Sequence, residues 1–207
     1  MSQISLPFDW PGQGAEDFLV SEANRIAVRH LEGWRDWSLP ISVLTGPSLS
    51  GRSTLGRHFA AMSHGTVIDD AQRRDEQALF NAWNEAKTDY RPLLLIGDAS
   101  PGQWVVALPD LRSRLAAVPH VAIAEPDEIL ARALIERGLD RAGASYSPDL
   151  PDWLLRRIDR SYRAIASTTR LLDDAALSSG RKISVALAKQ ALQAAGFLPI
   201  VQTDPAS

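Results

Sequence analysis

Cysteine is absent from this chain of 207 residues, which excludes disulfide bonds, thiolate metal sites and a cysteine nucleophile. Long hydrophobic runs are also missing, since none approaches the roughly 20 residues that a membrane-spanning helix needs. The N-terminus lacks the basic stretch and apolar core of a secretory signal. The four histidines show no metal-ligand spacing with carboxylates. We therefore expect a cytoplasmic protein without a histidine-bound metal.

Charge is modest in both signs. Twenty-two Lys and Arg residues stand against 25 Asp and Glu residues, which gives a formal net charge of −3. Because the chain has no strong basic block, we do not expect it to bind DNA directly in a sequence-specific way. With 45% hydrophobic and 23% charged residues, the composition is that of a globular protein with one domain, or a domain and a small appendage.

Hydrophobic periodicity predicts strands that alternate with helices in the first part of the chain. The expected strands are residues 41–44, 66–68, 93–96 and 121–123, and the expected helices are 15–34, 54–62, 75–87 and 108–116. After Pro126 the sequence predicts helices alone, at 127–142, 151–157, 162–178 and 184–195. This order predicts an α/β protein with a parallel sheet, followed by a separate all-helical part.

The strongest chemical signal lies between the first strand and the helix that begins near Thr54. The stretch Gly46-Pro47-Ser48-Leu49-Ser50-Gly51-Arg52-Ser53 fits the phosphate-loop pattern G-x-x-x-x-G-K-[ST], except that arginine replaces the lysine. In such a loop, backbone N–H groups and the positive end of the helix dipole converge on a phosphate. A wide guanidinium is a poorer fit than an ammonium to a transition state, so the loop favours binding over turnover. The alternative is an ordinary strand-to-helix turn.

Carboxylates follow two of the predicted strands. Asp69 and Asp70 end the second strand, and Asp98 follows the third. Magnesium on a bound phosphate needs a carboxylate to orient it, so we expect Asp69 to hold the metal's water shell together with Ser53, and Asp70 to polarise a water. Asp70 could instead cap the next helix. Asp98 either senses the nucleotide or serves as a turn residue.

Three arginines are further candidates. Arg112 and Arg114 stand two apart on one short predicted helix and therefore point in different directions. Arg163 opens a helix of the all-helical part, where it could reach phosphates or remain an exposed surface charge. The sequence leaves these alternatives open.

Taken in order, these segments resemble the DnaA/Hda family of AAA+ proteins, and the Hda branch more closely because of Arg52. The quoted segments are the phosphate loop, Val67-Ile68-Asp69-Asp70, Leu95-Ile96-Gly97-Asp98, Leu111-Arg112-Ser113-Arg114-Leu115 and Arg163. The resemblance implies Walker A and B motifs, Asp98 as sensor 1, Arg114 as a catalytic arginine finger and Arg163 as sensor 2. It also implies that the segment Asp17-Phe18-Leu19-Val20-Ser21-Glu22-Ala23-Asn24 lines an adenine pocket for ADP or ATP with Mg²⁺, with Phe18, Leu19 and Val20 as the contacting residues.

This sequence departs from the family in one large respect. Family members usually place a further strand and helix before the Walker B strand, whereas only Ser63-His64-Gly65 intervene here. We therefore expect a sheet of four strands that lacks one edge strand. The expected parts are a tail at 1–10, a nucleotide-binding base at 11–124, a helical lid at 125–196 and a C-terminal tail at 197–207.

The N-terminal residues resemble the short clamp-binding peptide of the Hda branch, with Gln3, Ile4, Leu6 and Phe8 as the contacting side chains. Such a peptide binds as an extended segment, and the alternative is an idle tail. The chain also ends after the predicted lid, where DnaA continues into a DNA-binding domain. The implied function is negative regulation of replication initiation: the protein binds the sliding clamp and stimulates hydrolysis of DnaA-bound ATP. The alternative functions are a stand-alone P-loop ATPase or kinase, and an adaptor that binds no nucleotide. A homodimer is a further form of the protein that the sequence leaves open.

Overall fold

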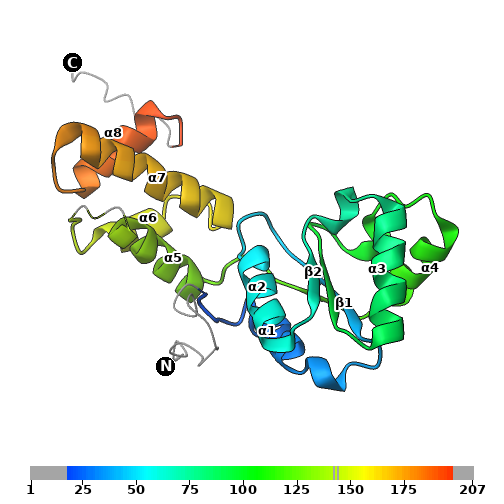
Figure 1. Cartoon of the computed structure of the whole chain (residues 1–207). Coiled ribbons are helices and arrows are strands. Elements are labelled where there is room, and N and C mark those ends of the chain that lie inside the picture. The colour runs from blue at the N-terminus through cyan, green and yellow to red at the C-terminus, as the bar shows by residue number, and fades with distance from the viewer. Residues whose placement is uncertain (1–17, 142, 144, 198–207) are drawn as a thin grey trace, which may run out of the picture. The chain divides into compact units, whose positions relative to one another are not determined.

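The computed structural model describes residues 18–141, 143 and 145–197. The chain divides into two compact units, Met1–Glu125 and Pro126–Ser207, which are described here one after the other. Figure 1 shows the elements of both units along the chain. Among the described residues, no helix has both the length and the apolar character that crossing a bilayer requires.

The first unit is built on a parallel sheet. Its strands are β1 (Ile41–Thr45), β2 (Thr66–Ile68), β3 (Leu93–Ile96) and β4 (His120–Ala122), in the order β2-β3-β1-β4. Every neighbouring pair is parallel, so all four strands end at the same edge of the sheet. The predicted α/β class with four parallel strands is confirmed, and β2 is one of the two edge strands.

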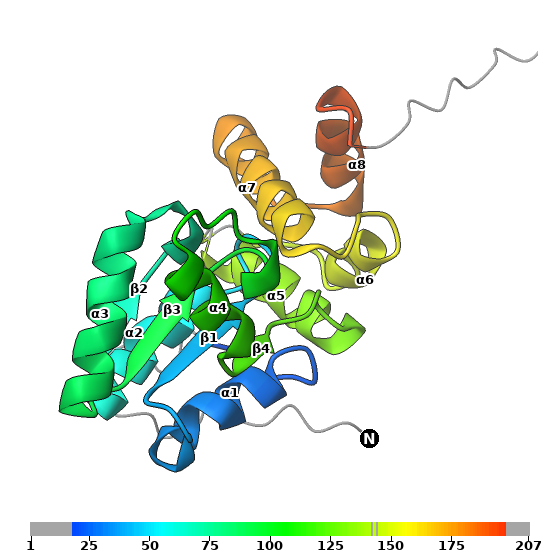
Figure 2. The ribbon, with the colours of Figure 1, turned by 90° about the vertical axis from the view of Figure 1, so that its right-hand side faces the viewer.

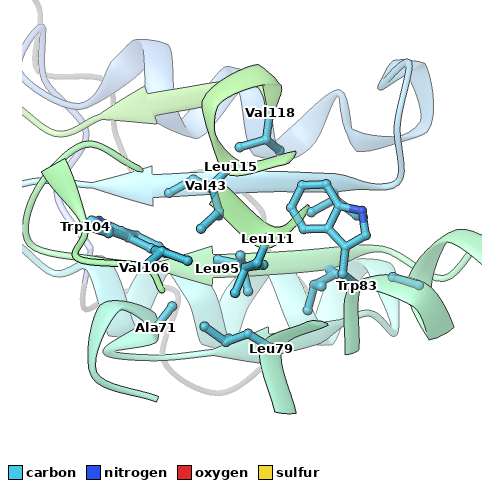
Figure 3. Packing of buried hydrophobic residues seen from close by; sticks show 13 residues of the cluster. Val43, Ala71, Leu79, Trp83, Leu95, Trp104, Val106, Leu111, Leu115 and Val118 are labelled. Atoms are coloured by element: carbon cyan, nitrogen blue, oxygen red, sulfur yellow. The ribbon is translucent and has the colours of Figure 1, made fainter. Parts of the chain in front are cut away.

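Helices cover both faces of this sheet. The four α-helices are α1 (Arg25–Glu32), α2 (Arg52–Ser63), α3 (Glu76–Asp89) and α4 (Pro109–Ala117), and short 3₁₀ turns lie at Trp34–Asp36, Ala71–Arg73 and Pro101–Gln103. Figures 1 and 2 show α1 and α2 on one face and α3 and α4 on the other. Between the sheet and α3/α4 lies a buried cluster that includes Val43, Leu95, Trp83, Leu111 and Leu115 (Figure 3).

The first helix is shorter than the sequence predicts. Residues 15–34 were expected to be helical, but α1 begins at Arg25, and the segment from Phe18 to Ser21 is not helical. The cause is the buried side chain of Asn24, which donates to Leu19 O (2.8 Å) and accepts from Ser21 N (2.9 Å). These bonds hold the preceding backbone in another conformation, as asparagine side chains often do near helix starts.

The second unit is helical, with α5 (Glu128–Arg141), α6 (Leu150–Leu155), α7 (Tyr162–Ser179) and α8 (Val185–Ala194). Its own apolar cluster includes Ile135, Leu139, Leu172 and Leu192. Helices α5 and α7 approach closely at Gly138, where an added Cβ would lie 2.7–2.8 Å from three side-chain atoms of Thr169.

Candidate functional site

The glycine loop joins the carboxyl end of β1 to the first residue of α2, Arg52. Gly51 has φ of +89°, and a Cβ there would lie 2.8 Å from the ring of Phe18, so both backbone and space require glycine. Leu49 has φ of +66° and exposes 63% of its surface at the loop. A side chain held in this conformation is strained by about 1–2 kcal/mol, which indicates that the loop geometry is imposed.

A buried hydroxyl inside this loop lacks a partner. The Oγ of Ser50 is buried and makes no hydrogen bond to any residue that the structure describes. A buried polar group without a partner costs about 1–3 kcal/mol, so native proteins usually satisfy such groups with a bound molecule or water. The loop thus presents two polar features side by side, this hydroxyl and the N-terminus of the 12-residue helix α2, where backbone N–H groups favour an anion.

Arg52 does not point its charge at a carboxylate. Its Nη1 donates to the backbone O of Gly97, at the end of β3, and no salt bridge joins it to a described acidic residue. The side chain is half-buried. Its positive charge is therefore oriented by a neutral carbonyl and left uncompensated beside the positive end of α2.

Asp98 lies one residue beyond this carbonyl and is held in place by the segment after β2. Its Oδ1 accepts from Nε2 of Gln72 (2.7 Å), and its Oδ2 lies 3.5 Å from Nη2 of Arg73. The ends of β2 and β3 are thereby joined at the edge where the loop lies. The structure places Asp98 where the sequence predicts a strand-end carboxylate, and its sensing role stays a prediction.

The residues expected to serve a magnesium ion also lie at this edge. Ser53 is exposed in the first turn of α2, and Asp69 is half-buried after β2 with its Oδ1 accepting from Asp70 N (3.0 Å). Asp70 is exposed with φ of +51°, and no capping bond from its side chain is seen. Among the described residues no group of three or more His, Asp or Glu could hold a metal alone. One hydroxyl and one carboxylate do fit Mg²⁺ that is bound mainly by phosphates and water.

The segment predicted to line an adenine pocket meets the loop through Phe18, whose ring packs against Gly51. Leu19 and Val20 follow it and are half-buried. Asn24, which is 3% exposed, fixes this segment through the two bonds described above. Asn24 is the last residue of the segment that the resemblance implies lines the adenine pocket, although only Phe18, Leu19 and Val20 were predicted to contact the base.

Arg112 and Arg114 differ sharply in their contacts. Arg112 donates to Val106 O through both Nε (2.9 Å) and Nη2 (2.5 Å), which secures the loop before α4. Arg114 donates from Nη1 to Oδ1 of Asn84 (2.7 Å), and its guanidinium lies 4.4 Å from the ring centroid of Phe80. An amide and an aromatic face orient a cation without neutralising it.

The loop before α4 has a second anchor in Glu76. Its carboxylate accepts from Ala107 N and Leu108 N, both at 2.7 Å. These two backbone hydrogen bonds, that from Ala107 first, lower the pKa of Glu76. Glu76 therefore fixes the start of the helix that carries Arg112 and Arg114.

The remaining predicted site residues lie in the second unit or outside the described part of the chain. Arg163 is exposed in the first turn of α7, in the second unit. Its expected role as sensor 2 stays a prediction. The expected clamp-binding residues Gln3, Ile4, Leu6 and Phe8 lie outside the described residues.

The parallel sheet with a glycine loop between β1 and α2, followed by a helical unit, is the AAA+ P-loop fold. The chain is similar to domain III of the Thermotoga maritima replication initiation protein DnaA, with a TM-score of 0.71 and 14% identity over 86% of this chain and 95% of that one. It is similar to DnaA from Aquifex aeolicus in its AMPPCP-bound structure, with a TM-score of 0.59 and 19% identity over 80% of this chain and 67% of that one.

A third similar structure is the Holliday junction branch migration motor RuvB of Thermotoga maritima, with a TM-score of 0.62 and 15% identity over 83% of this chain and 68% of that one. No family model matches the chain. At identities this low, the likeness establishes the fold, and function has to be argued from the site.

Proposed function

We propose that the first unit binds an adenine nucleotide, and ADP in preference to ATP, with its phosphates in the Gly46–Ser53 loop. The observation that carries this proposal is the buried, unpartnered Ser50 hydroxyl in a loop that also presents an uncompensated Arg52 and the start of α2. Ser53 and Asp69 would hold Mg²⁺ on the phosphates, where the ion would neutralise their charge. The segment from Phe18 to Val20 would contact the base. The AMPPCP-bound DnaA structures share this fold and support an adenine nucleotide as the ligand, without favouring ADP over ATP.

We further propose that the protein is a negative regulator of replication initiation that acts on the nucleotide of a partner. The loop lies at the edge where the strands end, whereas α4 runs back towards the start of β4 and carries Arg114 in its last turn. Arg114 therefore lies on the part of α4 nearer the opposite edge of the sheet from the loop. A guanidinium held by neutral groups at such a place suits an arginine finger supplied in trans, which accelerates hydrolysis about 10³–10⁵-fold in well-studied nucleotide hydrolases.

The partner in this proposal is ATP-bound DnaA, and the sliding clamp on DNA would recruit the protein through Gln3, Ile4, Leu6 and Phe8. Tethering raises the local concentration, so a weak contact between the two AAA+ proteins could suffice. The similarity to DnaA domain III supports this choice, because AAA+ modules of one shape can stack on each other. Arg163 keeps its expected role as sensor 2 in this proposal.

A nucleotide-free adaptor is the second candidate, and the contact of Arg52 with Gly97 O favours it, because the guanidinium already has a partner within the protein. The first experiment is to denature the purified protein and identify any released nucleotide by chromatography. Retained or readily exchanged ADP supports the proposal, an empty site that takes up no nucleotide supports the adaptor, and rapid ATP consumption without partners supports a stand-alone ATPase.

The regulatory step is tested with purified DnaA–ATP and DNA-loaded clamp. We expect Arg114→Ala to abolish stimulation of ATP hydrolysis. Full stimulation by this variant would exclude Arg114 as the finger. The double change Gln3→Ala, Phe8→Ala should remove clamp binding while ADP binding remains, and an unchanged clamp affinity would reject the tether.

A further inference from the structure

The contact between Arg52 and Gly97 joins two elements that a phosphate loop does not by itself connect. Arg52 is the first residue of α2, and Gly97 directly follows β3. Gly97 N donates in turn to Leu44 O of β1 (3.0 Å), so this residue is held between β1 on one side and the guanidinium on the other.

The turn from Gly97 to Ala99 is fixed from its other sides as well. The indole ring of Trp104 packs directly against Gly97, and its Nε1 donates to Ala99 O (2.8 Å). The carboxylate of Asp98 is bound by Gln72. The turn therefore has a single well-defined position in which its carbonyl meets Arg52.

The guanidinium retains most of its donors after this contact. It has five N–H groups in a planar fork, and the described residues accept a hydrogen bond from Nη1 alone, at Gly97 O. Its charge is unpaired among the described residues and stands at the positive end of α2, which disfavours a cation. A phosphate in the loop would supply acceptors for the free N–H groups and would compensate both positive charges.

Given the nucleotide binding proposed above, on which this inference rests, we infer that Arg52 binds the β-phosphate of a nucleoside diphosphate while it keeps its bond to Gly97 O. The planar fork can serve two acceptors at separate positions, whereas a lysine concentrates its donors on one atom. Arginine at the lysine position then has a function of its own. Its guanidinium would bond to the β-phosphate and to Gly97 O at the same time, and so would link α2 to the end of β3 through the nucleotide. A monophosphate offers no β-phosphate, so this arrangement favours a diphosphate.

Lysine is the residue that the phosphate-loop pattern specifies at this position, yet replacing Arg52 by lysine should lower the affinity of this site for ADP. We expect Arg52→Lys to lower the affinity for ADP about tenfold, as for a lost charge-assisted hydrogen bond, and to leave the affinity for AMP nearly unchanged. Titration calorimetry with ADP and with AMP measures both. Arg57→Lys is the matched control, since Arg57 lies on the same helix, is exposed and bonds only to Thr54 Oγ1 within the described residues.

A second measurement addresses the wild-type protein directly. Bound ADP should slow amide hydrogen exchange at Gly97 more than bound AMP does, because only ADP would fasten Arg52 from both sides. This readout keeps the test decisive if Arg52→Lys folds poorly, and a properly folded Arg52→Gln should show no difference between the two nucleotides.

Three results would overturn the inference. These are ADP binding to Arg52→Lys as tight as to the wild type, an equal loss for AMP and ADP, and exchange at Gly97 that does not distinguish the two nucleotides. A wild-type protein that binds no adenine nucleotide at all is a different outcome, since it removes the proposed function and this inference with it.

Discussion

The close fit of Phe18 on Gly51 in the candidate site yields a quantitative prediction. In Gly51→Ala the new Cβ would lie 2.8 Å from Cε2 and 3.2 Å from Cδ2 of the Phe18 ring, at a residue with φ of +89°. The left-handed backbone costs an L-residue about 1–2 kcal/mol. Loss of glycine freedom in the unfolded chain returns about 0.4–1 kcal/mol, and overpacking costs about 1–3 kcal/mol.

Together these effects predict that Gly51→Ala lowers the free energy of unfolding by about 1–5 kcal/mol. The thermal midpoint should fall by roughly 3–15 °C for a unit of this size. Thermal and urea unfolding followed by circular dichroism measure both quantities, and ADP titration should show a parallel loss of affinity. Gly102→Ala is the matched control, because a Cβ at Gly102 meets nothing within 4 Å, so this change should raise the free energy of unfolding only by the roughly 0.4–1 kcal/mol of lost glycine freedom and should leave the affinity for ADP unchanged.

The two contributions separate in a double-mutant cycle with Phe18→Ala. Removing the ring relieves the overlap but not the backbone strain, so Gly51→Ala should cost about 1–3 kcal/mol less in that background. The reasoning is refuted if Gly51→Ala unfolds at the same temperature as Gly102→Ala, or if the cost of Gly51→Ala does not depend on the ring.

Three further predictions concern other contacts. Asn84→Asp should keep or raise the thermal midpoint, because a carboxylate binds Arg114 more tightly than an amide does. The same change should abolish stimulation of DnaA-bound ATP hydrolysis, because the carboxylate neutralises the proposed finger. Stimulation at the wild-type level would count against this reasoning. Glu76→Gln should lose stability in urea unfolding at pH 7, where the wild-type carboxylate is charged. Because the folded-state pKa of Glu76 lies below the unfolded value of 4.5, the deficit should shrink as the pH falls from 4.5 through the lowered folded-state pKa, and a deficit that does not change with pH would contradict this. Gly138→Ala should destabilise the helical unit by about 1–3 kcal/mol, and Thr169→Ala should recover only part of this in thermal unfolding, because it removes the close Cγ2 and Oγ1 atoms but keeps the Cβ at 2.8 Å; an unaltered midpoint for Gly138→Ala would contradict the close packing.

The sheet could be predicted from the sequence because burial leaves a direct pattern in it. The continuous apolar run Leu93–Ile96 predicted a strand covered on both faces, and β3 indeed lies between β2 and β1 with all four residues buried. The direct link from α2 to β2 is made by Ser63-His64-Gly65, where Arg91 Nε donates to His64 O (3.0 Å). The expected four-stranded sheet follows from that short link.

The first helix was predicted too long for an equally physical reason. Periodic apolar residues continue from Phe18 to Leu31, and periodicity alone cannot show where a helix begins. The start at Arg25 is decided by the side chain of Asn24, which satisfies backbone groups that a longer helix would have needed for itself. Such competition depends on a rotamer and a hydrogen-bond partner that the sequence pattern does not contain.

In the candidate site, too, some features could be predicted from the sequence and others could not. The glycine loop and the strand-end carboxylates follow from local sequence and from the rule that parallel strands end at one edge. The partners of Arg52 and Arg114 are tertiary contacts, 45 and 30 residues away along the chain. A backbone carbonyl and the amide of Asn84 carry no charge, so nothing in the sequence marks them as partners of an arginine.

The nature of these partners bears on function more than their positions do. Arg132, in the helical unit, pairs with Glu136 and Asp152 and is neutralised by them. Arg52 and Arg114 are held instead by neutral acceptors, which fix the direction of the guanidinium and leave its charge available. A carboxylate at either place would stabilise the fold equally well and would compete with any phosphate. Neutral partners are not peculiar to these two arginines, since Arg112 and Arg91 also bond to backbone carbonyls. What the neutral partners of Arg52 and Arg114 do is leave both charges available, which the function proposed above requires: one guanidinium for the protein's own nucleotide and one for that of a partner.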